Sequence, residues 1–176
     1  MIEPKINLIA LFCYGSNNIE QVRARVNNQH IQAYKGLLPN YRRIFADYSN
    51  SWGGGIASIM YTSDPNLFCR GSYVLLTQQE IAKMNKFEGI TSSNPFDTDP
   101  SKNIYRHQPV LIQIENGNFI NGITYIKNTN NWISYPSISY LNACYKNIKP
   151  FWSNLDGNNY IMIYDNKGKL KGKYIG

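Results

Sequence analysis

Residues 6–17 read Ile6-Asn7-Leu8-Ile9-Ala10-Leu11-Phe12-Cys13-Tyr14-Gly15-Ser16-Asn17. The apolar run predicts a buried strand, and the Gly-Ser-Asn sequence after it predicts a turn into a helix. One face of that helix is apolar, with Ile19, Val22 and Val26. Asn17 or Asn18 can cap its first turn. The backbone N–H groups of such a turn have no partner within the helix. They can bind a carboxylate or an oxyanion, although many turns of this kind are only structural.

The composition is that of a globular protein. Of the 176 residues, 43% are hydrophobic, 14% are aromatic and only 16% are charged, so the chain can bury a sizeable core. The sequence contains no internal repeat and no linker. We therefore expect residues 1–176 to form a single domain.

The formal net charge of +7 raises the question of a nucleic-acid partner. Part of the excess lies near the C-terminus, where lysines alternate at Lys167, Lys169, Lys171 and Lys173. On an extended strand these lysines share one side, either to protect a sheet edge or to form a binding patch. No recognition helix or aromatic-and-basic RNA motif occurs, so a nucleic-acid partner is not expected. The positive charge could equally attract an anionic small molecule.

Cysteines and histidines are too scattered to predict a metal site or a disulfide framework. Cys13, Cys69 and Cys144 are widely spaced, and His30 and His107 match no metal motif. Unpaired cysteines are typical of a reducing compartment. No apolar stretch approaches the roughly 20 residues that a membrane-spanning helix needs. We therefore expect a cytoplasmic protein without a metal and without membrane contacts.

The remaining pattern predicts short strands and two further helices. Strands are expected at residues 30–36, 41–48, 56–61 and 71–76, in a hairpin at 108–115 and 119–127, and in a last hairpin over 160–175 that turns at 165–168. One helix is capped by Thr77 and Glu80 and ends at Glu88-Gly89, and another begins near Ser137. Strands and helices do not alternate regularly. The expected fold is therefore α+β, a small and mostly antiparallel β-barrel or curled sheet with flanking helices.

Two stretches between these elements have an unusual composition. Gly53-Gly54-Gly55 precedes a strand, which indicates a close backbone approach, a bulge or a sharp bend. It is a poor match to a phosphate-binding loop, because no Lys-Ser/Thr follows. Residues 90–103 are rich in Thr, Ser, Asn, Pro and Asp, which predicts a loop that can be mobile.

Glu88 is the carboxylate that the local pattern does not explain. The chain has five glutamates, and Glu20, Glu80 and Glu115 each fit a helix start, a capping box or a hairpin turn. A carboxylate at a helix C-terminus opposes the helix dipole, which costs a few tenths of a kcal/mol. Apolar neighbours would raise its pKa, as a general base working near neutral pH requires. The alternative is a solvated acid at a helix end.

Four short motifs occur in a specific order along the chain. They are Tyr14-Gly15-Ser16-Asn17, Trp52-Gly53-Gly54-Gly55-Ile56-Ala57-Ser58-Ile59, Phe87-Glu88-Gly89-Ile90 and Pro136-Ser137-Ile138-Ser139-Tyr140. Together they resemble the gamma-glutamylcyclotransferase family, whose relatives include AIG2-like proteins and gamma-glutamylamine cyclotransferases. The resemblance covers about residues 6–148 and leaves 149–176 as a C-terminal extension. It implies a small β-barrel with flanking helices.

The resemblance also implies an activity and a set of site residues. The family converts a gamma-glutamyl amino acid or amine to 5-oxoproline and releases the free amine, with no metal, nucleotide or other cofactor. The resemblance places the catalytic acid/base on Glu88 and the substrate-binding loop on residues 14–17, extended by Asn18 and Ile19. Three tyrosines are expected to line the pocket, namely Tyr125, Tyr105 and Tyr140.

Some features depart from the family or leave the function open. Residues 91–103 form a longer connection than usual and could reshape the side of the pocket that takes the leaving group. Residues 154–176 have no clear counterpart. The leaving group could be an amino acid, an amine or Cys-Gly, with the last ranked lowest. The oligomeric state is also open, and a homodimer is one of the alternatives.

Two other functions remain to be compared with the enzyme. A non-catalytic binding module on the same fold would use the basic C-terminal surface. An acyl hydrolase built on Cys13 or Ser16 is disfavoured, because no histidine is near in sequence and the turn does not fit a nucleophile elbow.

Overall fold

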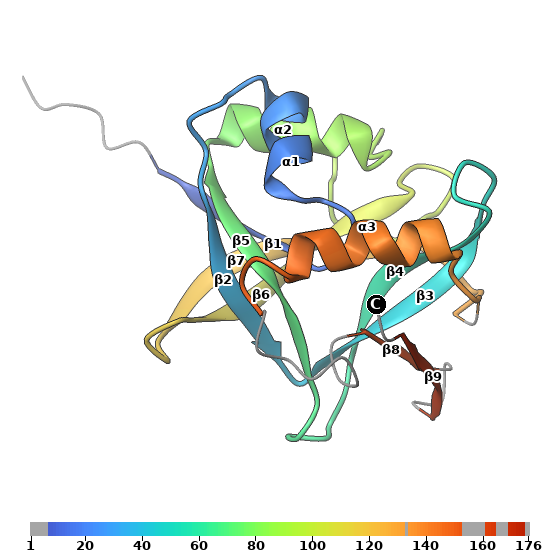
Figure 1. Ribbon diagram of the computed structural model, residues 1–176. Helices are drawn as coiled ribbons and strands as arrows, with labels where there is room; N and C mark the ends of the chain where they lie inside the picture. Colours follow the sequence, from blue (N-terminus) through green and yellow to red (C-terminus); the bar gives the residue numbers. More distant parts are fainter. Residues whose placement is uncertain (1–6, 133, 153–160, 165–168, 175–176) are drawn as a thin grey trace, which may run out of the picture.

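The computed structural model describes residues 7–132, 134–152, 161–164 and 169–174. Five strands form a closed barrel in the order β1 (Ile9–Cys13), β5 (Phe68–Leu76), β2 (Ala33–Pro39), β6 (Tyr105–Ile114) and β7 (Phe119–Lys127) (Figure 1). The parallel pairing of β1 with β7 closes the barrel, and the other neighbouring strands are antiparallel. The predicted α+β fold with a mostly antiparallel barrel is therefore confirmed.

Two further strand pairs lie beside the barrel. The first is the long hairpin of β3 (Tyr41–Ser49) and β4 (Gly54–Tyr61). The second, β8 (Ile161–Tyr164) with β9 (Leu170–Tyr174), is antiparallel, and β8 contacts β3. This confirms the two strands of the last hairpin. Its predicted turn, with Lys167, lies outside the described residues.

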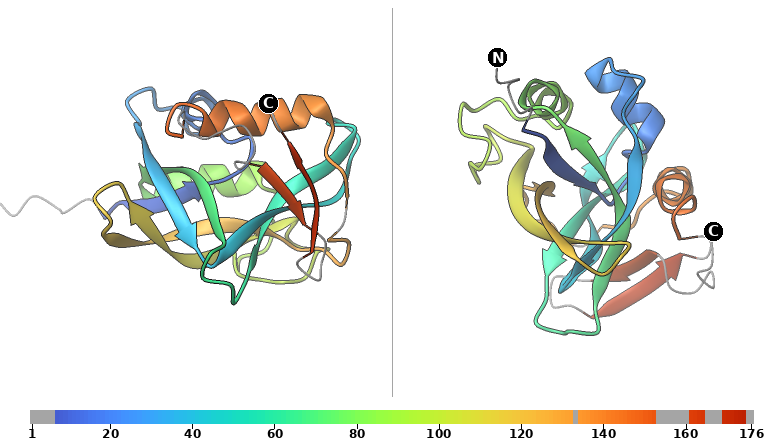
Figure 2. Two further views of the ribbon diagram at one scale, coloured as in Figure 1. Left: turned by 60° about the horizontal axis from the view of Figure 1, so that its bottom comes forward. Right: turned by 90° about the vertical axis from the view of Figure 1, so that its left-hand side faces the viewer.

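Three helices flank the barrel: α1 (Ile19–Val26), α2 (Gln78–Phe87) and α3 (Ile138–Ile148). Helices α1 and α2 lie side by side, whereas α3 packs separately against β5 (Figure 1; Figure 2). Of the two predicted candidates Asn18 caps α1, the predicted Thr77–Glu80 capping box begins α2, and Ser137, near which a helix start was predicted, caps α3. None of these helices is long and apolar enough to cross a membrane, within the part of the chain that the structure describes.

Strand β1 is buried on both faces. Because successive side chains of a strand point in opposite directions, its residues divide between two hydrophobic clusters. Ala10, Phe12 and Tyr14 belong to the hydrophobic cluster that joins the barrel to the β3–β4 hairpin and α3. Leu11 and Cys13 belong to a second cluster, which lies under α1 and α2. This double burial fixes the point at which the chain leaves β1 and enters the Gly15-Ser16-Asn17 turn.

Strand β2 is shifted from its predicted position. The sequence predicted a strand at residues 30–36 and a connection at 37–40, but the strand runs to Pro39 and Asn40 alone makes the turn, with φ 62°. Leu38 is completely buried in the barrel cluster, so the apolar residues of the expected connection are core residues. Proline is tolerated at this strand end.

The two glycines that begin β4, Gly54 and Gly55, are required by a close backbone approach, which is one of the predicted alternatives. A Cβ atom on Gly54 would lie 2.6 Å from the backbone nitrogen of Ser137, and one on Gly55 would lie 2.5 Å from the carbonyl oxygen of Ser134. The segment that leads into α3 therefore crosses directly over this strand. This crossing brings Tyr140 of α3 against β4.

Candidate active site

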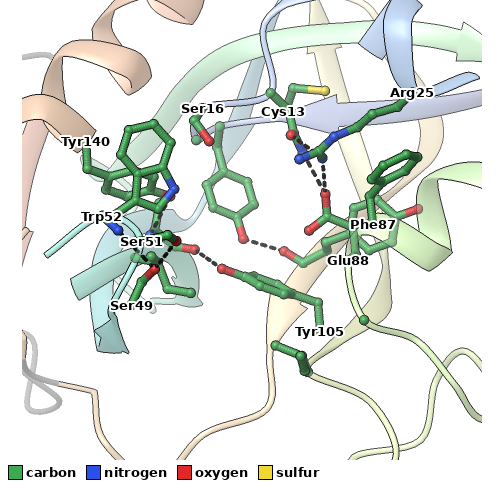
Figure 3. Close-up of a pocket in the computed structure, with 18 of the residues that line it drawn as sticks. Cys13, Ser16, Arg25, Ser49, Ser51, Trp52, Phe87, Glu88, Tyr105 and Tyr140 are labelled. Carbon is green, nitrogen blue, oxygen red and sulfur yellow. Dashed lines mark hydrogen bonds and ion pairs between the residues drawn. The ribbon is translucent and has the colours of Figure 1, made fainter. Parts of the chain in front are cut away.

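A cavity of about 520 Å³ opens where the β1–α1 turn, the end of α2, the β3–β4 hairpin and the start of α3 meet (Figure 3). Figure 3 shows Trp52 and Tyr140 on one side of it, with Arg25, Phe87 and Glu88 on the other. The predicted site residues that line it are Tyr14, Gly15, Ser16, Asn17, Glu88, Tyr105, Tyr125 and Tyr140. Residues far apart in sequence are thus brought to one place.

Two residues of the predicted loop do not line this cavity. Asn18 is the N-cap of α1, and its side-chain oxygen accepts a hydrogen bond from the Gln21 N–H at 3.0 Å. Ile19 packs against the hydrophobic cluster under α1 and α2. Their contacts are those of a helix start, because the chain has turned away from the cavity after Asn17.

The backbone of the turn is held from behind by buried side chains. Asn147 of α3 donates to the carbonyl oxygens of Cys13 and Gly15 at 3.1 and 3.3 Å. The Arg43 side chain donates to the carbonyl oxygen of Tyr14 at 2.8 Å. By contrast, the N–H groups of residues 15–17 donate to no acceptor in the described part of the chain. Backbone N–H groups in this state can receive a carboxylate or an oxyanion.

Glu88 follows the last residue of α2, where the helix ends on a left-handed glycine. Gly89 has φ +67°, and a Cβ atom there would lie 2.6 Å from Cδ1 of Ile104. The chain then returns, and the Tyr105 N–H donates to the carbonyl oxygen of Glu88 at 3.3 Å. The glycine therefore does two things: it ends the helix and it lets β6 start beside the carboxylate.

The Glu88 carboxyl is buried but not isolated. Its side chain is only 10% exposed. Oε1 accepts hydrogen bonds from the Asn17 side-chain amide and from Nη1 of Arg25, each at 3.0 Å. Burial raises the pKa of Glu88, while Asn17, Arg25 and the more distant charge of Lys127 act to lower it. The balance is a raised pKa, as the sequence suggested.

Arg25 is the residue that the sequence analysis missed. Nη1 of Arg25 donates to Oδ1 of Asn17 at 2.8 Å as well as to Glu88, and its guanidinium lies 5.1 Å from the centre of the Phe87 ring. Arg25 lies in the last turn of α1, and no local pattern of the sequence relates it to Glu88, which is 63 residues away.

Tyr140 and Tyr105 hold the same residue of β4 from two sides. The Tyr140 hydroxyl accepts a hydrogen bond from the Ala57 N–H at 2.9 Å, and the Tyr105 hydroxyl donates to the Ala57 carbonyl oxygen at 3.0 Å. Trp52 packs on Tyr140 with 5.0 Å between the ring centres. These aromatic side chains form the wall of the cavity that faces Glu88.

Tyr125 reaches a buried polar network behind the cavity. Its hydroxyl donates to Oδ1 of Asn85 at 2.8 Å, and Nε2 of His107 lies 2.7 Å from the same oxygen. Burial lowers the pKa of His107, which favours the neutral form of the ring. The Tyr14 hydroxyl donates to the carbonyl oxygen of Tyr125. Tyr125 is thus fixed at both its backbone and its hydroxyl.

Residues 91–103 do not line the cavity. The segment is instead braced by the completely buried Asn103, whose side chain bonds to the backbone of Thr91, Ser92, Asn94 and Asp97. It reaches the site indirectly, through His107: the Phe96 ring meets the His107 ring edge to face at 5.4 Å, and the Pro95 carbonyl oxygen accepts from the His107 N–H at 2.8 Å. The expected reshaping of the pocket by this loop is therefore not direct.

Among the residues that the structure describes, the site contains no arrangement for nucleophilic catalysis by a thiol or hydroxyl. Burial raises the pKa of Cys13 to about 12, so the thiol is neutral. Neither His30 nor His107 lines the cavity beside Cys13 or Ser16. Among the described residues, no three side chains of His, Cys, Asp or Glu gather into a metal-binding group.

Comparisons with known proteins agree with the fold. A structure named "Gamma-glutamyl cyclotransferase" is similar with TM-score 0.69 and 21% identity, over 85% of this chain and 83% of that one. An uncharacterized Homo sapiens protein has TM-score 0.68 and 22% identity, over 84% and 82%. YkqA from Bacillus subtilis has TM-score 0.64 and 18% identity, over 84% of this chain and 51% of that one.

At these identities the solved structures show the fold alone. The comparison with curated protein sequences gave no match. The sequence profile of one family, described as "Gamma-glutamyl cyclotransferase, AIG2-like", matches residues 11–142, which include the turn, Glu88 and all three pocket tyrosines. The chain belongs to the gamma-glutamyl cyclotransferase, AIG2-like family.

Proposed function

We propose that the protein is a gamma-glutamylcyclotransferase, with Glu88 as its general acid/base. The substrate is a small gamma-glutamyl compound, which closes to 5-oxoproline and releases a free amine. The observation that carries this proposal is the Glu88 carboxyl, buried at the wall of the cavity and hydrogen-bonded to Asn17 of the anion-holding turn. Membership of the family supports the same reaction class.

The reaction needs few protein groups, because the nucleophile is part of the substrate. The α-amine of the gamma-glutamyl group attacks the γ-carbonyl carbon and closes a five-membered ring. Tethered reactions of this kind reach effective molarities of about 10⁵ M or more in the right conformer. At neutral pH an α-amine, whose ordinary pKa is about 8, is mostly protonated and cannot attack. A base must therefore remove its proton.

Glu88 can perform the proton transfers. It takes one proton from the α-ammonium, and the free amine then attacks, so that the new C–N bond forms and the γ-carbonyl becomes an oxyanion. Glu88 gives this proton to the departing nitrogen as the old amide C–N bond breaks and the oxyanion returns to a carbonyl. The carboxylate then takes the second proton of the ring nitrogen and passes it to the released amine, so the products are 5-oxoproline and the amine in its ammonium form, and no water is consumed. A carboxyl with a raised pKa is suited to these steps.

The β1–α1 turn and the cavity walls would hold the substrate. The N–H groups of residues 15–17 can receive its α-carboxylate or the oxyanion that develops on the γ-carbonyl. Lys86 is a cationic side chain in the lining, so it favours an anionic compound. Tyr105 and Tyr140 would enclose the bent chain of the substrate opposite Glu88.

A panel of gamma-glutamyl amino acids, gamma-glutamyl amines and glutathione, monitored for 5-oxoproline, tests the proposal. We expect release from at least one class and its loss in Glu88→Gln. A wild type that is inactive on the whole panel would contradict it. Salt-sensitive binding of RNA or protein by that inactive protein would then favour the non-catalytic module. The substrate that reacts fastest identifies the leaving amine and therefore the branch of the family.

A further inference from the structure

The two oxygens of Glu88 have different surroundings. Oε1 accepts hydrogen bonds from both Asn17 and Arg25. Oε2 accepts no hydrogen bond from the described residues, and this atom is not buried. It is therefore accessible from the cavity that Glu88 lines. A carboxylate held through one oxygen presents the other in a fixed direction.

We propose that Arg25 is a positioning residue, which holds Oε1 of Glu88 so that Oε2 is the oxygen that exchanges protons with the substrate. This inference rests on the proposed function. Nη1 of Arg25 bonds to Asn17 and Glu88 at once, so it joins the substrate-holding turn to the acid/base. The Phe87 ring, 5.1 Å from the guanidinium, limits where the group can lie. Arg25 thus acts through Glu88 and need not touch the substrate.

Arg25 is also the cation in contact with Glu88. Of the other cations, Lys127 is 3.3 Å from the carboxylate of Asp47, and Lys86 lines the cavity without an ion pair to Glu88 in the described structure. The remaining titratable groups around the carboxyl are neutral, since burial raises their pKa: the Cys13 thiol and the hydroxyls of Tyr14, Tyr105, Tyr125 and Tyr140. Removal of Arg25 would leave burial opposed mainly by the hydrogen bond from Asn17.

Lysine should replace Arg25 only in part. A guanidinium can bond two oxygens in a fixed plane and stack on a ring, whereas an ammonium is a compact charge on a flexible stem. The Arg25 side chain is 21% exposed, so solvent screens part of its charge. An opposite charge at this distance shifts a carboxyl pKa by 1–3 units, and we expect about one unit here.

The first experiment titrates Glu88 directly, by NMR of protein labelled with ¹³C at the glutamate carboxyl. The chain has only five glutamates, and Glu88→Gln identifies the signal. Arg25→Gln should raise the pKa of Glu88 by about one unit, and Arg25→Lys by less. Arg23→Gln is the matched control: it removes the same charge from the same helix, but Arg23 bonds to the Ile31 carbonyl oxygen. An unmoved titration in Arg25→Gln would overturn the proposal.

The second experiment follows 5-oxoproline release against pH on the best substrate of the panel. We expect the acid limb of kcat/KM to move up by the same amount in Arg25→Gln, with kcat about tenfold lower and KM nearly unchanged. A purely structural role would lower Tm and leave the limb in place. A rise in KM alone would make Arg25 a substrate ligand and contradict the proposal. If no substrate reacts, the proposed function fails, but the titration still decides whether Arg25 controls Glu88. If Arg25→Gln does not fold, Arg25→Lys carries both tests.

Discussion

The side-chain amide of Asn17 lies 3.0 Å from Oε1 of Glu88, although the two residues are 71 positions apart in the sequence. Asn17 ends the turn after β1, and Glu88 ends α2. The contact therefore sets the distance between the group that would hold the substrate and the group that would move its proton. Because Oδ1 of Asn17 also accepts from Arg25, the amide is fixed at both ends. Small displacements of either helix would change the geometry of the whole site.

Glu88→Gln should remove most of the activity and keep the fold. Glutamine has the same shape and can still accept at Oε1, but it cannot take the proton of the α-amine. General acid–base catalysis is worth about 10²–10⁴-fold, so we expect kcat for 5-oxoproline release to fall by that factor. Glu115→Gln, at an exposed position of the β6–β7 hairpin, is the control and should react at the wild-type rate. Near-normal turnover in Glu88→Gln would exclude Glu88 as the acid/base.

The stability of Glu88→Gln relative to wild type should depend on pH. The folded-state pKa of Glu88 is raised, so its stabilising contribution is fully present below the unfolded value of about 4.3 and is lost as pH rises through the folded value. The free energy of unfolding of Glu88→Gln should therefore gain on that of wild type as pH rises from the unfolded value through the folded value, by about 1.4 kcal/mol per unit of pKa shift. Urea unfolding at several pH values measures this. A constant difference across the range would mean that the pKa is not raised.

The sequence predicted the parts of the site that are local patterns. The turn after β1, the capped helix α2 and the stop at Gly89 each depend on a few neighbouring residues, so they could be recognised directly. Arg25 could not, because its partners come from the turn before its helix and from α2, which packs beside it only in the folded protein.

Packing also decided where the structure differs from the sequence analysis. The segment 37–39 was expected to connect two strands, but burial of Leu38 in the barrel makes it part of β2. Asn18 and Ile19 were carried over with the substrate-binding loop, yet the start of α1 takes them away from the cavity. The position of the alternating lysine side chains stays a prediction.

Asn103→Ala should loosen residues 91–103 with little effect on the cavity. The Asn103 side chain makes four hydrogen bonds to that segment and is fully buried, so its loss should cost about 2–4 kcal/mol of stability. Limited proteolysis should then cut within the segment, whereas KM should change less than twofold, since no residue of the segment lines the cavity. Asn94→Ala, at an exposed position of the same loop, is the control. A large rise in KM would show that the loop shapes the substrate site after all.

Tyr140→Phe should destabilise the protein more than Tyr105→Phe does, although each change removes one hydroxyl that is hydrogen-bonded to the backbone of Ala57. The first change leaves the buried Ala57 N–H without its acceptor, which costs about 1–3 kcal/mol. The second leaves a carbonyl oxygen without a donor, and such oxygens tolerate this better, so we expect about 0.5–1.5 kcal/mol. Urea unfolding gives both values. Burial raises the pKa of both hydroxyls well above its ordinary range, so neither change should move the acid limb of the pH profile. An equal cost for the two variants would mean that water replaces the Tyr140 hydroxyl on Ala57. A shifted acid limb would mean that a tyrosine shares the proton transfer assigned to Glu88.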